Sequence, residues 1–475
     1  MSRNVHPAGQ LHADMLTEGA TSAPPVDLNA LEGGIWSATA ERVGGAISVG
    51  GVDLRTLVRE HGSPAYVLDE TDFRARSRAH REAFAGFDVY YAGKAFLSTT
   101  VARWLAEDGL SLDVCTLGEL AIARRAGFPA ERIALHGNNK SVAELSAALD
   151  EGVGRIVVDS FVEIDRLAKL AADKGAQPSV LLRASVGVEA HTHEFIATAH
   201  EDQKFGFAIA TGEALEAVRR VLASAPLRLV GLHSHIGSQI FDTDAYELAA
   251  QRLVRLALRV RDQHDLTIQE LGMGGGLGIA YVPGDDPPAT EEFATALRTI
   301  VTRECEANGL PVPRLSVEPG RAIAGPAMCT VYEVGTVKPV RIGSAGVRTY
   351  VSVDGGMSDN IRTALYGAEH SCAVANRASE SPPVLARVVG KHCESGDIVV
   401  RDVYLPGDVA PGDLVAVPGT GAYCRAMASN YNQVPRPPIV AAREGRSRVV
   451  VRRETMDDLL RLDVGADDTD REAKE

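Results

Sequence analysis

Short apolar runs and longer amphipathic stretches alternate along the chain between about residues 63 and 325. The short runs are rich in β-branched residues, and the stretches between them have helical periodicity. Repeated strand–helix units of this kind predict a parallel sheet covered by helices. The predicted strands are Val89–Gly93, Leu112–Thr116, Ile133–Gly137, Ile156–Asp159, Val180–Ser185, Leu229–His235, Gln269–Gly274 and Leu315–Glu318.

Helix boundaries are marked for two of these units. Thr116-x-x-Glu119 and Ser160-x-x-Glu163 predict capping boxes, and Gly127 and Gly175 stand where the two helices should end. Eight units in about 260 residues fit a (β/α)8 TIM-type barrel. An open doubly wound sheet would give a similar alternation, so that alternative stays open on periodicity alone.

The pattern changes after Gly325 to short strands separated by Gly and Pro turns, which predicts a C-terminal β-sandwich or β-barrel-like domain. Its predicted strands are Thr330–Val337, Tyr350–Val353, Val384–Val389, Ile398–Tyr404 and Leu414–Val417. We therefore expect a poorly ordered extension (1–35), a segment whose strand at 46–54 pairs with the C-terminal strands (36–62), a barrel (63–325), a β domain (326–465) and a poorly ordered acidic tail (466–475).

Composition narrows the functional classes. The net charge of -14 over 475 residues argues against a surface for nucleic acid or anionic membrane. Every apolar stretch is interrupted before the roughly 18 residues that a membrane helix needs. The six cysteines form no C-x-x-C pair and no metal-binding spacing, so we predict reduced thiols, no metal site and a cytoplasmic location.

Polar residues at the ends of predicted barrel strands are candidates for chemistry, because barrel active sites lie at the carboxyl ends of the strands. Lys94 ends the first strand, and burial there would make its amine nucleophilic. Taken alone, Lys94 is more often a solvated surface lysine. His233 and His235 share one face of the sixth strand, where an imidazole could stack on a flat cofactor or serve in a structural or metal-binding pair.

The seventh strand leads into a glycine-rich loop at residues 272–278, whose bare backbone could approach a phosphate. The spacing fits neither a Walker loop nor a complete dinucleotide loop. The eighth strand ends at Glu318-Pro319-Gly320-Arg321, which is either a surface ion pair or a pyridine-nitrogen partner next to a carboxylate binder. An amine, a ring, a phosphate cradle and a carboxylate at barrel strand ends together favour a pyridoxal-phosphate (PLP) site.

Four motifs carry a resemblance to a known family: residues 91–96 (Tyr-Ala-Gly-Lys-Ala-Phe), 233–239 (His-Ser-His-Ile-Gly-Ser-Gln), 274–278 (Gly-Gly-Gly-Leu-Gly) and 318–321 (Glu-Pro-Gly-Arg). The chain resembles the barrel-type PLP decarboxylases, which include ornithine, arginine and diaminopimelate decarboxylases, from about residue 30 to about residue 465. The resemblance implies a Schiff base at Lys94, ring stacking by His235 and a pyridine-nitrogen contact from Glu318. It places the remaining cofactor contacts at Ser238, Gly274, Gly275, Gly276, Gly320, Arg321 and Tyr423.

The same resemblance extends into the β domain and implies a homodimer with shared active sites. Cys393 and Glu394 would come from the neighbouring subunit, with Cys393 returning a proton after carbon dioxide leaves. Substrate contacts are implied for Arg321, Arg362, Tyr366, Glu394 and Tyr423.

Two arginines at the far end of the substrate favour a second carboxylate, and so favour diaminopimelate over ornithine or arginine. Alternatives are a decarboxylase of another basic amino acid, a racemase, against which Glu318 counts, and a PLP-free regulator. Residues 187–194 also resemble the diaminopimelate enzymes, and His191 with His193 could instead be a metal pair.

Overall fold

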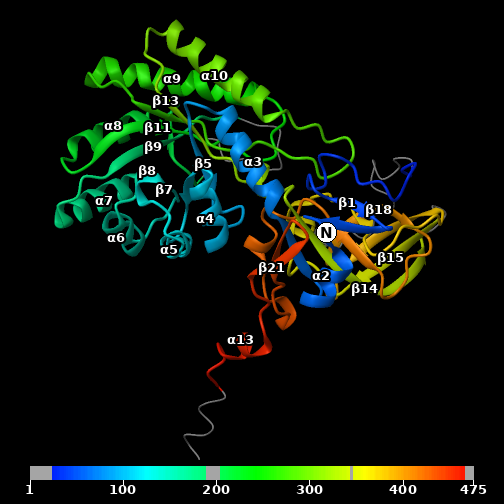
Figure 1. Ribbon diagram of the computed structural model, residues 1–475. Coiled ribbons are helices and arrows are strands. Elements are labelled where there is room, and N and C mark those ends of the chain that lie inside the picture. The colour runs from blue at the N-terminus through cyan, green and yellow to red at the C-terminus, as the bar shows by residue number, and fades with distance from the viewer. Residues whose placement is uncertain (1–23, 189–203, 343–345, 466–475) are drawn as a thin grey trace, which may run out of the picture. The chain divides into compact units, whose positions relative to one another are not determined.

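The computed structural model describes residues 24–188, 204–342 and 346–465. The described chain divides into two compact units, which can be followed by colour in Figure 1. The barrel unit contains Phe73–Ile279 and Asp285–Gly325. The β unit contains the chain up to Asp72, the short segment Ala280–Gly284, and the chain from Pro326 onward.

The barrel unit confirms the predicted (β/α)8 barrel. Among the described residues, eight parallel strands pair in the order β9, β11, β12, β13, β5, β6, β7, β8, and a further pairing of β8 with β9 closes the ring. Each predicted barrel strand coincides with one of them: β5 (Asp88–Ala92), β6 (Ser111–Val114), β7 (Ile133–Leu135), β8 (Arg155–Val158), β9 (Ser179–Ser185), β11 (Arg228–His233), β12 (Glu270–Gly272) and β13 (Arg314–Val317). The short strand β10 (Phe207–Ala208) pairs with the end of β9.

Helices lie outside the ring of strands (Figure 1). They are α3 (Glu70–Ala83), α4 (Thr99–Glu107), α5 (Leu117–Ala126), α6 (Val142–Glu151), α7 (Phe161–Lys174), α8 (Glu213–Ala223), α9 (Asp244–His264) and α10 (Thr290–Ala307). The buried four-residue helix α11 (Arg321–Ala324) follows β13. Gly127 and Gly175 end α5 and α7 in the left-handed conformation, as predicted.

The predicted capping boxes are half formed. Thr116 and Ser160 accept hydrogen bonds from the backbone N–H groups of Glu119 and Glu163. Both carboxylates are also held by other partners: Glu119 accepts from the amide of Cys115, and Glu163 pairs with Lys140. Complete boxes are found at the start of α6, between Ser141 and Glu144, and at residues 455–458, between Thr455 and Asp458.

A mixed sheet organises the β unit. Its strands follow the order β18 (Ile398–Pro406), β17 (Pro383–Val389), β15 (Val347–Val353), β14 (Met328–Arg341), β4 (Ala65–Asp69), β20 (Ile439–Arg443), β21 (Arg446–Val451). The additional strand β19 (Leu414–Val417) pairs with β14 and with β16 (Ala373–Val374). Short helices are α2 (Leu54–His61), α12 (Arg362–Tyr366) and α13 (Met456–Leu460).

The N-terminal segment differs from expectation. Residues 46–54 form β2 (Ala46–Val49) and β3 (Val52–Asp53), which pair with each other and with β1 (Glu41–Val43). Instead, β4 is the upstream strand that pairs with C-terminal strands, because its fully buried residues need partners on both edges. Within the predicted disordered extension, Ile35 is buried in the core of this unit; residues 1–23 and 466–475 lie outside the described residues.

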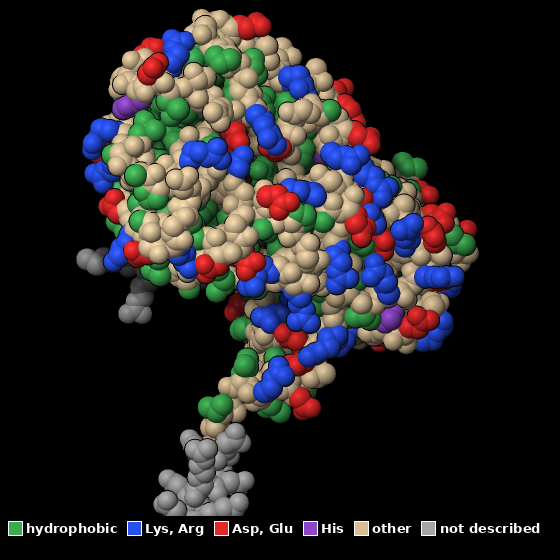
Figure 2. All heavy atoms as spheres, turned by 60° about the vertical axis from the view of Figure 1, so that its left-hand side comes forward, with side chains coloured by type: hydrophobic (Ala, Val, Ile, Leu, Met, Phe, Trp, Pro, Cys, Tyr) green, Lys and Arg blue, Asp and Glu red, His purple; other side chains and the backbone are tan. Residues whose placement is uncertain are grey.

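Charged side chains are interspersed on the face shown in Figure 2, where Lys and Arg alternate with Asp and Glu. Within the described parts of the chain, no helix is both long enough and apolar enough to cross a membrane.

A buried ion pair joins two neighbouring units of the barrel. Lys140, in the connection between β7 and α6, lies 2.7 Å from the Glu163 carboxylate, and both side chains are almost inaccessible. Its ammonium group also donates to the carbonyl oxygens of Gly137 and Val157, at 2.6 and 2.7 Å. The three contacts together satisfy a cation that would be very costly to bury alone.

Replacement of Lys140 by Met should lower the free energy of unfolding by about 3–5 kcal/mol, because it leaves a buried carboxylate without its partner. Urea unfolding followed by circular dichroism measures the change. Lys174→Met is the matched control, since Lys174 pairs with Asp150 at 2.6 Å on the surface and should cost no more than about 1 kcal/mol. Equal losses in the two variants would contradict a structural role for the buried pair.

Candidate active site

Four neighbouring barrel strands carry the predicted chemistry at their carboxyl ends. Their order around the ring is β11, β12, β13, β5, and they lead directly into His235, the glycine loop, Glu318 and Lys94. Closure of the barrel places these ends on one rim. The structure therefore brings together groups that are up to 224 positions apart in the sequence, from Lys94 to Glu318.

Lys94 is exposed in this chain, which is the environment expected for it when its position alone is considered. It stands in the turn after β5, where its side chain leaves the packed part of the strand. Its ammonium group still acts on neighbouring groups. Burial is the main cause that lowers the pKa of His235 well below its usual value, and the Lys94 charge adds to that effect.

Glu318 is a buried carboxylate with two imidazoles beside it. Its Oε1 lies 2.7 Å from Nε2 of His233 and 3.3 Å from Nε2 of His136. Burial alone would raise the pKa of Glu318, but His233, His136 and the hydrogen bond from His233 outweigh burial and hold that pKa well below its usual value. Glu318 is therefore ionised at neutral pH.

Asp113, on β6, is the second buried carboxyl of this cluster. Burial and then the Glu318 charge raise the pKa of Asp113 well above its usual value, while Lys94 opposes the rise. Its Oδ1 lies 3.7 Å from Nε2 of His136. Two adjacent buried carboxyls cannot both ionise without great cost, so this pair holds one negative charge, and that charge is on Glu318.

His235 is held as a neutral ring. The backbone N–H of Gly275 donates to its Nδ1 at 3.2 Å, which leaves the proton on Nε2. Because burial and the Lys94 charge also lower its pKa, His235 carries no charge at neutral pH. A flat, neutral imidazole fixed by the glycine loop suits stacking on an aromatic cofactor ring.

The glycine loop has no room for side chains. A Cβ on Gly275 would lie 2.1 Å from the carbonyl oxygen of Glu318, and one on Gly276, whose φ is +124°, would lie 2.7 Å from the carbonyl oxygen of Gly237. Among the described residues, the N–H groups of Gly276 and Gly320 have no hydrogen-bond partner. Bare backbone with unpaired N–H groups fits a phosphate group.

Arg321 and Ser238 meet at the same rim. The buried Arg321 guanidinium donates from Nη2 to Ser238 Oγ at 2.9 Å. This contact orients the Ser238 hydroxyl and uses N–H donors of the Arg321 guanidinium within the barrel unit.

Within the β unit, α12 carries Arg362 at its start and Tyr366 at its end. Arg362 is buried, with its guanidinium 4.4 Å from the centre of the Tyr281 ring and its Nη1 3.4 Å from Nε2 of His370. The Tyr366 hydroxyl lies 3.9 Å from the sulfur of Met427. Stacking on an aromatic ring fixes the orientation of the planar guanidinium fork, which suits recognition of a carboxylate.

The loop with Cys393 and Glu394 combines exposed side chains with a fixed backbone. Both side chains are exposed, whereas the preceding His392 is buried and bonds through Nε2 to Ser358 at 2.8 Å. The backbone N–H of His392 donates to Asp397 at 2.8 Å. The predicted contact residue Tyr423 has a positive φ of 64°, a conformation that non-glycine residues adopt mostly at functional or strained positions.

The sequence interpretation missed His136 and Asp113 and left the role of His233 open. A signal was present: Asp113 interrupts an apolar strand, and His136 directly follows one. Their convergence on Glu318 depends on strand register, which local patterns do not contain. The loop with His191 and His193 lies outside the described residues.

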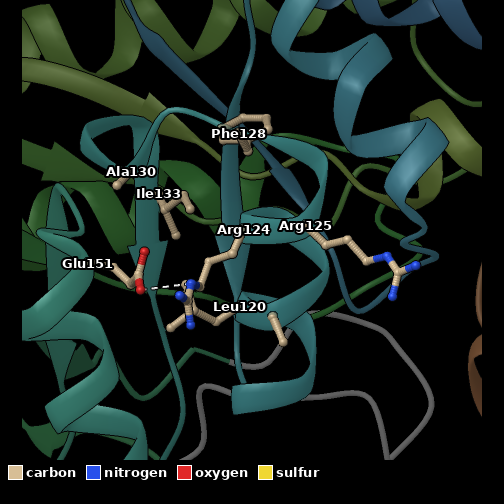
Figure 3. Close-up of a pocket in the computed structure, with 8 residues that line it drawn as sticks. Leu120, Arg124, Arg125, Phe128, Ala130, Ile133 and Glu151 are labelled. Carbon is tan, nitrogen blue, oxygen red and sulfur yellow. Dashed lines mark ion pairs between the residues drawn. The ribbon is translucent and has the colours of Figure 1, made fainter.

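A groove of about 490 Å³ lies elsewhere on the barrel unit (Figure 3). Its lining comes from the end of α5, the start of β7 and the end of α6, and includes an ion pair between Arg124 and Glu151 at 2.7 Å. Strands of a barrel begin at the face opposite their carboxyl ends, so this groove is not part of the candidate site.

Comparisons with known proteins agree with this geometry. Residues 70–325 match the model of the pyridoxal binding domain of pyridoxal-dependent decarboxylases. The diaminopimelate decarboxylase of Mycobacterium tuberculosis is 59% identical over 425 residues, covering 88% of this chain and 95% of that protein. The Bacillus subtilis enzyme of the same name is 45% identical over 88% of this chain and 95% of its own. Diaminopimelate decarboxylase from M. jannaschii in complex with L-lysine superimposes with a TM-score of 0.83 at 29% identity, covering 90% of this chain and 98% of that one.

Replacement of Gly275 by Ala should weaken binding of PLP at least about tenfold and destabilise the fold by about 1–3 kcal/mol, because the new methyl group collides with the Glu318 backbone. Fluorescence titration with PLP and thermal unfolding measure the two effects. Gly118→Ala, at the start of α5 with only ordinary contacts nearby, should change neither affinity nor stability adversely. Normal PLP affinity in the Gly275 variant would show that the loop does not approach the cofactor.

Proposed function

The chain belongs to the pyridoxal-dependent decarboxylases, among the diaminopimelate decarboxylases, and on that basis we propose a role for each side chain of the site. Its reaction is the PLP-dependent decarboxylation of meso-2,6-diaminopimelate to L-lysine and carbon dioxide, the last step of lysine biosynthesis. The observation that carries the assignment of residues is the arrangement of Lys94, His235, the glycine loop and Glu318 on adjacent barrel strands.

The barrel residues fit PLP. Lys94 would hold the cofactor covalently until a substrate amine replaces it, and the neutral His235 ring would stack on the pyridine. The N–H groups of Gly276 and Gly320, with Gly274, Gly275, Ser238 and Arg321, would surround the phosphate, and Tyr423 is the proposed contact from the β unit. The ionised Glu318 would keep a proton on the pyridine nitrogen.

PLP supplies the electron sink that makes loss of carbon dioxide feasible. The chain's own residues orient the substrate. Arg321, Arg362 and Tyr366 would bind the carboxylate at the non-reacting end, and Glu394 would bind the ammonium group beside it. A substrate with a lone distal amine would leave the arginine donors without an acceptor, which disfavours ornithine.

We further propose that the enzyme is a homodimer in which Cys393 and Glu394 complete the partner's site. Their exposure on a loop with an anchored backbone supports this, since such side chains can reach another subunit without loss of position. Cys393 would return a proton to the carbon that lost carbon dioxide. All six cysteines are free thiols, which suits the reducing cytoplasm as the place of action.

Purified protein supplied with PLP should release carbon dioxide from meso-diaminopimelate and not from ornithine or arginine. Lys94→Ala should lose the absorbance of lysine-bound PLP and reduce turnover to background, because the covalent attachment point is gone. Lys169→Ala, an exposed lysine on α7, is the control and should behave as the unmodified enzyme. Release from ornithine alone would refute the substrate; an active K94A enzyme would refute the proposed role of Lys94.

Co-expression of K94A and C393A chains tests the shared site. Each homodimer should be inactive, whereas random pairing gives heterodimers with one intact site, so the mixture should recover about a quarter of full activity. Sedimentation analysis confirms the dimer and its exchange. No recovery, despite mixed dimers, would mean that both residues serve the same chain's site.

A further inference from the structure

The cluster around Glu318 contains three ionisable side chains to which the proposed PLP contacts assign no role: Asp113, His136 and His233. Two carboxyls, Glu318 and Asp113, share one negative charge in the barrel interior, and either could in principle carry it. Which carboxyl is ionised matters only if the proposed contact of Glu318 with the pyridine nitrogen is correct, so the inference below rests on that proposal.

His233 donates its hydrogen bond to Glu318. The 2.7 Å contact joins its Nε2 to Glu318 Oε1, and an ionised carboxylate can only accept, so Nε2 carries the proton. Within the described chain, the buried Nδ1 of His233 has no hydrogen-bond partner. The imidazole is thus turned so that its one polar contact is with this carboxylate.

The strand next to His233 leaves room for the ring. Gly272 on β12 is paired with His233, and a Cβ there would lie 2.7 Å from its Cδ2. A side chain at residue 272 would displace the imidazole from Glu318. Because Gly272 has no side chain, the imidazole of His233 can keep the orientation in which it contacts Glu318.

His136 is fixed by its backbone on both sides. Its N–H donates to the carbonyl oxygen of Val114 at 2.8 Å, and the next carbonyl oxygen, that of Gly137, accepts from Lys140. Its Nε2 lies closer to Glu318, at 3.3 Å, than to Asp113, at 3.7 Å. Burial lowers the pKa of His136 well below its usual value, so this ring is neutral, and its Nε2 favours charge on Glu318 by its closer approach.

We propose that His233 and His136 are positioning residues that keep the shared negative charge on Glu318, and so keep the cofactor's pyridine nitrogen protonated. They act through Glu318 and do not touch the substrate. Each carboxylate has about four acceptor positions, so two imidazole contacts leave capacity for a pyridinium N–H. Without the imidazoles the charge moves toward Asp113, Glu318 becomes neutral, and the electron sink weakens.

The test uses holoenzyme reconstituted with PLP labelled with ¹⁵N in the pyridine ring, whose resonance reports protonation of that nitrogen. H233L and H136L should shift the resonance toward the unprotonated position and lower kcat about 10- to 100-fold, the range for losing a residue that orients a ligating group. KM for diaminopimelate should change less than about threefold, since substrate contacts are intact. H233Q restores an N–H donor and should recover part of the shift and of kcat.

Two further variants make the outcomes distinct. His80→Leu removes another buried imidazole, from α3, and should leave the resonance unchanged whatever its effect on stability. E318Q should give the full loss of protonation. A protonated nitrogen in both histidine variants but not in E318Q overturns this inference alone, whereas a protonated nitrogen in E318Q overturns the proposed role of Glu318 itself.

The metal content of the purified enzyme supplies an independent outcome. The donor atoms of His136, His233 and Glu318 lie within 4.8 Å of one another, a spacing that a divalent cation could bridge. One bound zinc per chain that survives PLP reconstitution and disappears in H136L would overturn the positioning role, because the imidazoles would then be ligands.

Discussion

Pairing of β8 with β9 is the constraint on which the barrel unit depends. It turns an open row of parallel strands into a ring without edges, and so places every carboxyl end on one rim. Lys94, Glu318 and His235 are brought together by that closure and not by any contact between their own segments. The order and closure of the strands therefore determine the site, and each side chain lies in the short turn that follows its strand.

Charge pairing is the second level of organisation. The barrel interior holds ionisable groups that would destabilise it if left alone, and two of them have well-defined partners: Lys140 has Glu163, and Glu318 has His233 and His136. The two sets differ in consequence. The ammonium group of Lys140 contacts Glu163 and two backbone carbonyls, so its contacts stay within the packed barrel. The carboxylate of Glu318, at the carboxyl ends of the strands, still has acceptor positions for a further hydrogen bond.

Prediction from the sequence succeeded where periodicity or motif chemistry is local. The barrel strands, the ends of α5 and α7, and the strand positions of Lys94, His235 and Glu318 follow from patterns only a few residues long. It failed where a residue's role depends on a distant partner. His136 was missed because its importance depends on the register of β7 relative to β13, which two other strands separate in the ring.

The placement of β4 has a consequence for how the chain folds during synthesis. This strand is made before the barrel, but its sheet partners β14 and β20 lie after the barrel in the sequence. Because chains emerge from the ribosome amino end first, the barrel sequence is complete while β4 still has two unpaired edges. The β unit must then close loops across the whole barrel, an entropic cost that slows its assembly. The strand β4 is therefore the segment of the β unit that stays longest without its partners during synthesis.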